Sequence, residues 1–331
     1  MKKTFLFIFP LYSALLAIDV KVTVVDEVGD AVVGAEVQII LVNGGKETMN
    51  SGKSNHKGQF QADGRPTNLM MIFSSKPKHY PARINEMKAR QDLDFQVVLP
   101  RVQNPVPLYA WDSFRDVPVE IPVQEQWLGF DFEKADWVAP NGKGRTPDIL
   151  FRFKNEFKGW QDRFESAQHL EEIITISKKV YAARKEEWTM DKFKVSAGKW
   201  DGVLEISFPG KGDGLYVEKK ILTYSELSMP HSAPIDGYVP SWVYKSNNYS
   251  PSACRKDVGF FLRTRVRLDK DGRVISANYA KVIGDFCLDA ARSSFSFSYY
   301  FNPYPDDRNL EFDPKNNLFP KDKPGTNVYN R

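Results

Sequence analysis

The chain has 331 residues, of which 42% are hydrophobic and 27% charged, so it is long enough to bury two ordinary hydrophobic cores. Its formal net charge is +4, and Lys2 and Lys3 at the N-terminus contribute to it. The rest of the chain is therefore too weakly basic for a nucleic-acid partner, and we expect two globular domains with no nucleic acid bound.

The first residues have the three parts of a secretory signal peptide. Lys2 and Lys3 form the charged start, Phe5–Leu16 is an apolar run too short to stay in a bilayer as a helix, and Ala17 offers the small residue that a signal peptidase needs. We expect cleavage near Ala17. The mature protein would then be periplasmic or secreted, with no transmembrane segment left after cleavage.

Residues 18–101 alternate between apolar and polar side chains and contain frequent turns. Val20, Val22 and Val24 share one face of a predicted strand, and Gly29–Asp30 then turns the chain. Roughly seven short strands in about eighty residues are typical of a β-sandwich.

The same stretch carries a family pattern. Its residues are Val24, Asp26, Gly29, Val33, Gly34, Ala35, Val37, Gly58, Phe60 and Tyr80. With these residues the stretch resembles the carboxypeptidase regulatory-like domain, which has the transthyretin-like prealbumin fold. Two positions depart from the pattern: Ala31 stands where such domains often have proline, and Lys78–His79 where a glycine commonly precedes the tyrosine. The resemblance implies an accessory module and not a catalytic one.

Proline is frequent between residues 100 and 122. A proline-rich stretch connects domains more readily than it pairs in a sheet, because proline lacks a backbone donor. We therefore place the junction near 102–106 and expect one domain at 18–101 and a second at 102–331.

The second domain contains all the tryptophans and many short apolar runs separated by glycine and proline. We expect a larger, Trp-rich β-sandwich with a jelly-roll-like arrangement, in which 173–176 is one of the extended runs. The few short helices expected are 164–172 or 179–187, and 190–195 with Thr189 as its cap. In segments such as EFDPKNNLFP this domain resembles uncharacterised secreted bacterial proteins that carry the same front module, and the resemblance implies no activity.

The two cysteines, Cys254 and Cys287, flank a predicted hairpin. Val258–Leu268 and Val274–Ile283 have the pattern of its strands, and Asp269–Gly272 has the Asp-Gly pair of a tight turn. Two cysteines at the open end of such a hairpin are a disulfide candidate in an oxidising compartment.

The register of this hairpin follows from keeping its apolar and polar faces apart. We expect Leu262 to face Tyr279 and Val266 to face Ile275, and the same register sets the two cysteines opposite each other. The alternative is a hairpin shifted by a bulge, in which the cysteines are two separate buried thiols.

The sequence contains no complete catalytic signature. His169 and Glu172 have the H-x-x-E spacing of zinc carboxypeptidases, but a third ligand is not evident among the few other histidines. The glycine-rich loops at 141–145 and 210–214 lack the spacing of nucleotide sites, and Asp269–Gly272 lacks the later ligands of a calcium loop. We expect no catalytic residue, no metal and no cofactor; a metal-dependent hydrolase is an alternative.

Three tryptophans, Trp111, Trp127 and Trp137, lie in loop-like sequence where exposed aromatic rings are suited to ligand contact. A flat indole stacks on the apolar face of a sugar, although tryptophan also serves as a core residue. The sequence thus favours a non-enzymatic structural or protein-contact module of the bacterial envelope, with an envelope protein as partner. The alternative is a carbohydrate-binding protein that uses these tryptophans to hold a polysaccharide.

Overall fold

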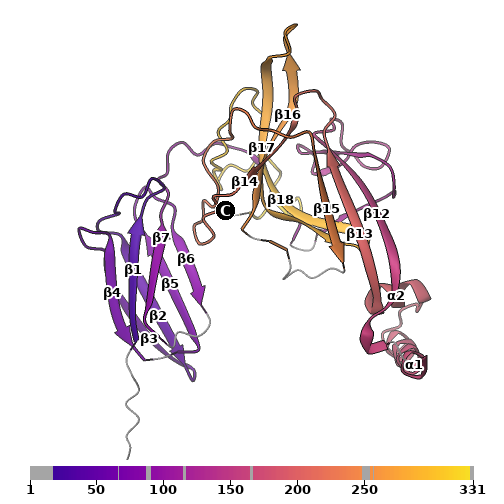
Figure 1. The fold of residues 1–331 in the computed structure, drawn as a ribbon, viewed down its shortest axis with the longest axis horizontal. Helices are drawn as coiled ribbons and strands as arrows, with labels where there is room; N and C mark the ends of the chain where they lie inside the picture. The colour runs from indigo at the N-terminus through magenta and orange to yellow at the C-terminus, as the bar shows by residue number, and fades with distance from the viewer. Residues whose placement is uncertain are drawn as a thin grey trace, which may run out of the picture. The chain divides into compact units, whose positions relative to one another are not determined.

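The computed structural model describes residues 18–65, 67–86, 91–114, 117–164, 167–247, 254–255 and 257–328. The predicted signal peptide and its cleavage site at Ala17 lie outside the described residues. The described part of the chain divides into two compact units (Figure 1). Unit 1 consists of the described residues of Met1–Val102 together with Tyr224–Glu226. Unit 2 consists of the described residues of Gln103–Thr223 and Leu227–Arg331. Both units are built mainly of strands, which confirms the predicted fold class.

Unit 1 is a two-sheet β-sandwich. One sheet has the strand order β4-β1-β7 and the other β3-β2-β5-β6. Inward-facing valine, isoleucine and leucine side chains of both sheets form one shared hydrophobic core. The strands are Ile18–Val25 (β1), Glu36–Asn43 (β2), Lys46–Lys53 (β3), Gln59–Gly64 (β4), Leu69–Ser75 (β5), Ala82–Glu86 (β6) and Leu93–Val98 (β7).

The turn after β1 is fixed by Asp26. Its Oδ1 accepts hydrogen bonds from the backbone N–H groups of Val28 (3.1 Å) and Asp30 (2.9 Å), and Gly29 supplies the positive φ of 95° that the turn requires. Arg101 Nη2 donates to Asp26 Oδ2 at 2.7 Å and so joins the end of the unit to its beginning.

Unit 2 contains two antiparallel sheets. The five-stranded sheet has the order β11-β10-β12-β13-β15, and the six-stranded sheet has the order β14-β16-β17-β18-β8 with β9 also paired to β18. The strands are Tyr109–Asp112 (β8), Val119–Glu120 (β9), Leu128–Asp131 (β10), Asp136–Trp137 (β11), Ile149–Trp160 (β12), Gly198–Ser207 (β13), Gly214–Glu218 (β14), Ser241–Asn247 (β15), Gly259–Leu268 (β16), Val274–Asp289 (β17) and Ser294–Asn302 (β18).

The two sheets of unit 2 enclose a core that is rich in aromatic rings. Every residue of β18 is buried, because this strand lies inside the six-stranded sheet and both faces of that sheet are covered. Phe295, Phe297 and Tyr299 point into the core between the sheets, whereas Tyr300 packs on the other face under the loops. Serine and aromatic residues alternate over the first part of this strand, as expected where successive side chains point to opposite faces of a sheet.

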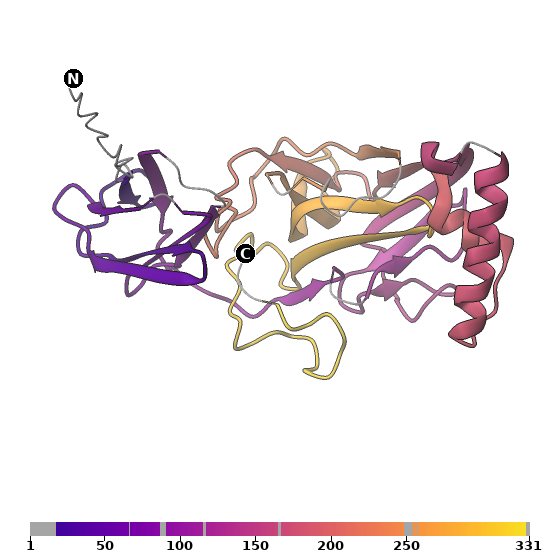
Figure 2. The same cartoon turned by 90° about the horizontal axis from the view of Figure 1, so that it is seen from below.

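The helices stand at one end of unit 2, beyond the ends of β12 and β13 (Figure 2). The short 3-10 turn Asp162–Phe164 (η1) precedes Ala167–Ala183 (α1), and Met190–Ala197 (α2) follows. The prediction for α2 is confirmed, since Thr189 Oγ1 accepts from Lys192 N at 3.2 Å as the N-cap.

The extended run predicted at 173–176 is wrong, because these residues lie inside α1. One continuous helix also replaces the two alternative short helices. Leu170, Ile173 and Ile174 are spaced as one face of a helix, and they pack against a small buried cluster made of Phe164, Phe193 and Ala197. This packing outweighs the weak helix propensity of isoleucine.

The β16–β17 hairpin has its turn where predicted, with Asp269 N donating to Arg273 O at 2.9 Å, but the expected register is wrong. Leu262 faces Ala280 and not Tyr279, a shift of one residue. The pairing slips again between Thr264 and Arg267, where Arg265 has a positive φ of 56°.

The structure nevertheless joins Cys254 and Cys287 in a disulfide, with their Cα atoms 5.6 Å apart. The pairing of β17 with β18 has a further irregularity between Ile283 and Cys287. There Asp285 N donates to Arg255 O at 3.1 Å, which holds the segment that carries Cys254 against β17. A bulged hairpin and a disulfide therefore occur together in this chain and are not alternatives.

Candidate functional site

The three candidate tryptophans have different surroundings. Trp111 and Trp137 are only 3% and 6% exposed, so the expectation that their rings are exposed is wrong. They lie at inward-facing positions of the short strands β8 and β11, and their Nε1 atoms donate to backbone carbonyls of Pro324 (2.9 Å) and Glu120 (2.8 Å). Trp127 is 43% exposed and stays a candidate.

Trp127 borders the outer face of the five-stranded sheet. The register of this sheet places Arg152 of β12 opposite Glu205 of β13, and Glu205 opposite Val243 of β15. Their neighbours along the strands point the other way, into the core. The outer face thus carries a row made of Trp127, Arg152, Glu205 and Val243, of which Val243 is 51% exposed.

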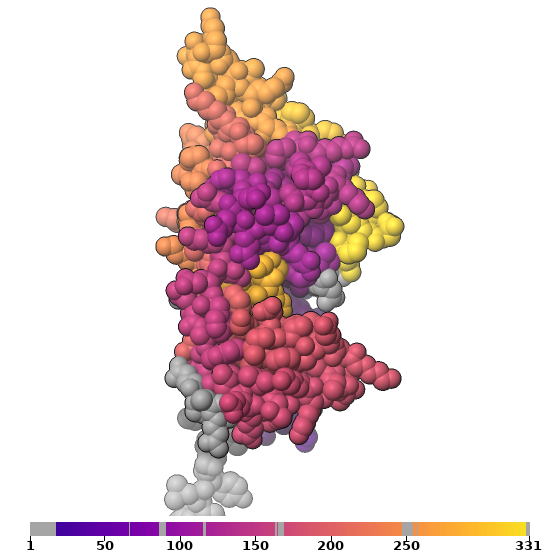
Figure 3. All heavy atoms as spheres, turned by 90° about the vertical axis from the view of Figure 1, so that its right-hand side faces the viewer, coloured from indigo at the N-terminus to yellow at the C-terminus, as the bar shows by residue number. Residues whose placement is uncertain are grey.

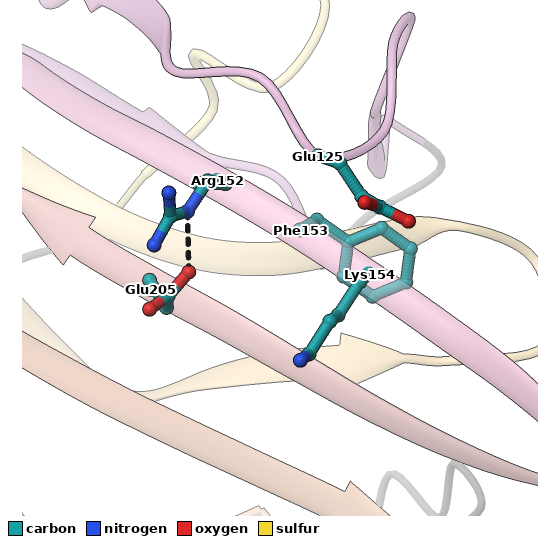
Figure 4. Close-up of a pocket in the computed structure, with 5 residues that line it drawn as sticks. All are labelled: Glu125, Arg152, Phe153, Lys154 and Glu205. Carbon is teal, nitrogen blue, oxygen red and sulfur yellow. Dashed lines mark hydrogen bonds and ion pairs between the residues drawn. The ribbon is translucent and has the colours of Figure 1, made fainter.

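The row includes a small pocket of about 270 Å³, lined by Glu125, Arg152, Phe153, Lys154 and Glu205. Figure 4 shows Arg152 hydrogen-bonded to Glu205 on one side of the pocket, with Lys154 and Glu125 on the other. Two acidic and two basic side chains therefore surround one opening.

Three contacts fix the geometry of this pocket. The guanidinium carbon of Arg152 lies 4.8 Å from the centre of the Trp127 ring, so a cation covers one face of the indole. Arg152 Nε donates to Glu205 Oε2 at 2.5 Å. Glu125 has a positive φ of 61°, and its N–H donates to Phe153 O at 2.8 Å, which holds the loop before β10 over the sheet.

The ion pair in the pocket stays charged at neutral pH. The hydrogen bond from Arg152 lowers the pKa of the Glu205 carboxyl, and the same bond raises the pKa of the Arg152 guanidinium. Both side chains are partly exposed to water, so the pair adds little to stability, and its main effect is to hold a guanidinium plane against the indole.

A second charged cluster is buried inside unit 2. Asp148, which is fully buried, accepts hydrogen bonds from Arg265 Nε (2.7 Å) and Arg265 Nη2 (3.1 Å), and Arg265 also contacts Glu133. Burial raises the pKa of Asp148 to about 6, against the opposing effect of Arg265. The cluster joins the loops that carry Glu133 and Asp148 to strand β16, and none of its residues lines the Trp127 pocket.

A buried lysine, which no motif in the sequence indicates, forms a third polar centre. Lys281 of β17 is fully buried on the face of the six-stranded sheet that the loops cover, and burial lowers its pKa to about 7 while the nearby Glu311 carboxylate opposes this. Glu311 is buried too and accepts from Gln103 N (2.9 Å) and Asn104 N (2.6 Å). The only signal in the sequence is a lysine between Ala280 and a valine.

The Asp-Gly motif lies in a hairpin turn, and the H-x-x-E motif lies on a helix. Asp269 Oδ1 accepts from the backbone N–H groups of Asp271 (2.9 Å) and Arg273 (2.8 Å), so the Asp-Gly segment is a side-chain-capped hairpin turn. His169 and Glu172 lie on the exposed part of α1.

Within the described ranges, no group of three or more histidine, cysteine, aspartate or glutamate side chains could hold a metal ion. Nor do those ranges contain a helix long and apolar enough to cross a membrane.

Comparison with known structures finds distant structural similarities. No family profile matches the chain, and no curated protein matches it either. A streptococcal ancillary pilin is similar over 42% of this chain and 53% of the pilin, with 11% identity and a TM-score of 0.21, so the chain spans about half the length of that protein. A DUF3823 family protein from Parabacteroides merdae is similar over 86% of this chain and 96% of its own, with 8% identity and a TM-score of 0.19. Neither similarity is strong enough to assign a fold or a function.

Proposed function

We propose that the chain is a secreted or periplasmic, non-enzymatic structural or protein-contact module of the bacterial envelope, and that unit 2 binds an envelope protein through the outer face of its five-stranded sheet. The observation that carries this proposal is the row Trp127–Arg152–Glu205–Val243, in which large side chains are held in place on an open sheet face. Tryptophan and arginine are the residues that most often anchor protein interfaces.

The composition of the row supports a protein partner. Val243 is 51% exposed and Trp127 43%, so the face offers apolar area beside the charged pocket. An antiparallel sheet that faces only water usually presents polar side chains there. An exposed apolar area with a charged border is typical of a contact surface.

A role outside the cytoplasm is supported by the disulfide between Cys254 and Cys287, because disulfides persist in oxidising compartments. Unit 1 would be a carboxypeptidase regulatory-like module that serves as a spacer or docking unit. Its seven described strands in two sheets are compatible with that family's sandwich.

Carbohydrate binding is the second candidate function, and Trp127 is the residue that would carry it. Its ring is exposed, and the carboxylates and amines of the pocket could take sugar hydroxyl groups. Against this candidate, Arg152 already covers one face of the indole at 4.8 Å, so that face is not free to stack on a sugar ring.

A photo-crosslinking experiment tests the protein partner. A benzophenone amino acid in place of Lys154 at the edge of the pocket, introduced into the full chain in bacterial cells, is expected to give one discrete protein adduct. The adduct should fall several-fold with Trp127→Ala or Arg152→Ala in the same chain. The same probe in place of exposed Lys211, on the loop before β14, serves as the matched control. If the Lys154 probe gives no adduct beyond that of the Lys211 probe, the proposal is wrong.

A tryptophan fluorescence titration separates the second candidate. Soluble cell-wall polysaccharides added to the purified chain should leave the emission unchanged if the partner is a protein. A saturable shift that Trp127→Phe reduces and Trp127→Ala removes would instead establish sugar binding.

A further inference from the structure

Helix α1 has an exposed apolar side that unit 2 does not cover. Leu170, Ile173 and Ile174 pack against the small aromatic core at this end of the unit, but Ile176 is 48% exposed and Val180 41%. In Figure 3 the segment around residues 170–190 forms a ridge on the face toward the viewer, open to solvent.

The exposed aliphatic side chains form a stripe. Ile176 and Val180 are four residues apart, and Ile176 follows Ile173 of the packed face by three residues, so the two exposed side chains lie along one side of the helix, next to that face. An aliphatic stripe of this kind on a surface helix is typical of a helix that packs against another helix.

Two charged residues border the stripe. Glu172 and Lys179 are both exposed and are seven residues apart, so they project on the same flank of the helix. Along the helix axis, Glu172 precedes Ile176 by four residues and Lys179 follows it by three. Neither takes part in an ion pair within the part of the chain that the structure describes. Lys178 differs, since its Nζ lies 4.8 Å from the centre of the Trp188 ring of the same chain.

The order of these charges is not explained by the helix itself. Acidic residues interact favourably with the helix dipole in the first turn of a helix, and basic residues do so in the last turn. The first turn of α1 contains no acidic residue, and its last turn contains no basic residue. An acidic half followed by a basic half is, however, complementary to itself when two such helices run antiparallel.

We infer that α1 is a self-association surface, and that its occupant is the antiparallel α1 of a second copy of this chain. A two-fold axis close to Ile176 places Glu172 of each copy opposite Lys179 of the other. The same axis brings the two Ile176 side chains together and covers Val180 on both copies.

The size of this contact sets its strength. A helix of 17 residues is about 25 Å long, so a single helix pair buries less than the roughly 1,200 Å² of a standard stable interface. We expect a reversible dimer that forms as the chain is concentrated, with a dissociation constant in the micromolar range or weaker.

A charge-exchange experiment tests the arrangement. Sedimentation velocity of the purified mature chain over a range of concentrations should show a monomer–dimer equilibrium. Glu172→Lys alone and Lys179→Glu alone should each weaken the dimer at least several-fold, because each sets like charges opposite each other. An equimolar mixture of these two variants should recover the dimer, and so should the chain that carries both substitutions. Lys211→Glu, an equal charge change away from the helix, should leave the equilibrium unchanged.

Cysteine crosslinking locates the axis. Both native cysteines are in the disulfide, so an introduced cysteine is the only free thiol among the described residues. Ile176→Cys should form a crosslinked dimer under mild oxidation, whereas Ala182→Cys, about 120° around the same helix, should not.

Three outcomes would overturn the inference. The first is a chain that stays monomeric at every concentration. The second is a dimer that neither single charge variant weakens, or one that the mixture fails to restore. The third is a monomer that binds vesicles of phosphatidylglycerol and loses this binding with Ile176→Glu, since α1 would then contact a membrane surface. Circular dichroism of every variant confirms that the helix is retained.

Discussion

The Nζ atom of Lys281 lies 4.9 Å from the centre of the Tyr300 ring, on the neighbouring strand, and the Lys281 side chain is fully buried. The amine has no hydrogen-bond partner among the residues that the structure describes. Burial accordingly lowers its pKa to about 7, with the nearby Glu311 carboxylate as the opposing charge. Glu311 in turn has His231 Nε2 at 3.9 Å from its Oε1.

The buried amine makes stability depend on pH. Its pKa is about 7 in the folded chain and about 10.4 in the unfolded chain, so between these values only the unfolded state binds the proton. The stability that Lys281 gains from being neutral in the folded chain is fully present above the unfolded pKa, and it is lost as the pH falls from there to 7. We expect this residue to raise the free energy of unfolding by on the order of 1 kcal/mol per pH unit from pH 7 to pH 10.

Urea unfolding of wild type and Lys281→Met at pH 7, 8, 9 and 10 measures this slope. The difference between the two slopes isolates Lys281, because all other groups titrate in both proteins. Lys211→Met, at an exposed position, should keep the wild-type slope. Equal slopes in wild type and Lys281→Met would contradict the prediction.

The fold of unit 1 was predictable because its signal is local. Val20, Val22 and Val24 are fully buried, as period-two alternation requires of a strand with one face in the core. Turn residues such as Asp26 and Gly29 act on their immediate neighbours, so their effect can be read from a few residues of sequence. Roughly seven short strands and a β-sandwich could be predicted from such signals without knowledge of distant contacts.

The errors in unit 2 arose where distant contacts decide. The β16–β17 register shifts at Arg265, whose guanidinium bonds Asp148, 117 residues earlier in the chain. Trp111 and Trp137 lie on strands of four and two residues, which are too short for alternation to show an inward side. The Trp127 pocket could not be predicted, since Arg152 and Glu205 are 53 residues apart and meet only through strand pairing.

The pair Arg265–Asp148 gives a second prediction. Replacing Arg265 with alanine leaves the fully buried Asp148 carboxylate without its two guanidinium bonds, and we expect a loss of about 3–5 kcal/mol in the free energy of unfolding. Arg265→Lys should recover only part of it, because a lysine cannot make the bidentate contact. Urea denaturation measures both. Arg273→Ala, at an exposed position of the same hairpin, should stay within about 0.5 kcal/mol of wild type.

The disulfide gives a third prediction. Cys254 and Cys287 are separated by 33 residues, and the double variant with serine at both positions should lose about 2–4 kcal/mol of stability, since the unfolded chain is no longer constrained. Thermal unfolding with and without a reducing agent checks it: the wild type should lose several degrees on reduction, and the double-serine variant should not respond. A wild type indifferent to the reductant would show that the bond does not constrain this hairpin.

The contrast between two tryptophans gives the last prediction. Trp111 is packed among Phe130, Phe297 and Tyr299, with ring centroids 5.9–6.1 Å away, so Trp111→Ala should remove about 3–5 kcal/mol of stability by leaving a cavity. Trp127 is 43% exposed and packs against Arg152 at the surface, so Trp127→Ala should cost less than about 1 kcal/mol while it lowers the yield of the Lys154 photo-adduct. Denaturation and crosslinking of both variants, with the adduct yield taken at a temperature where each is fully folded, separate the two effects. A Trp127→Ala chain as unstable as Trp111→Ala would mean that Trp127 belongs to the core and not to a binding surface.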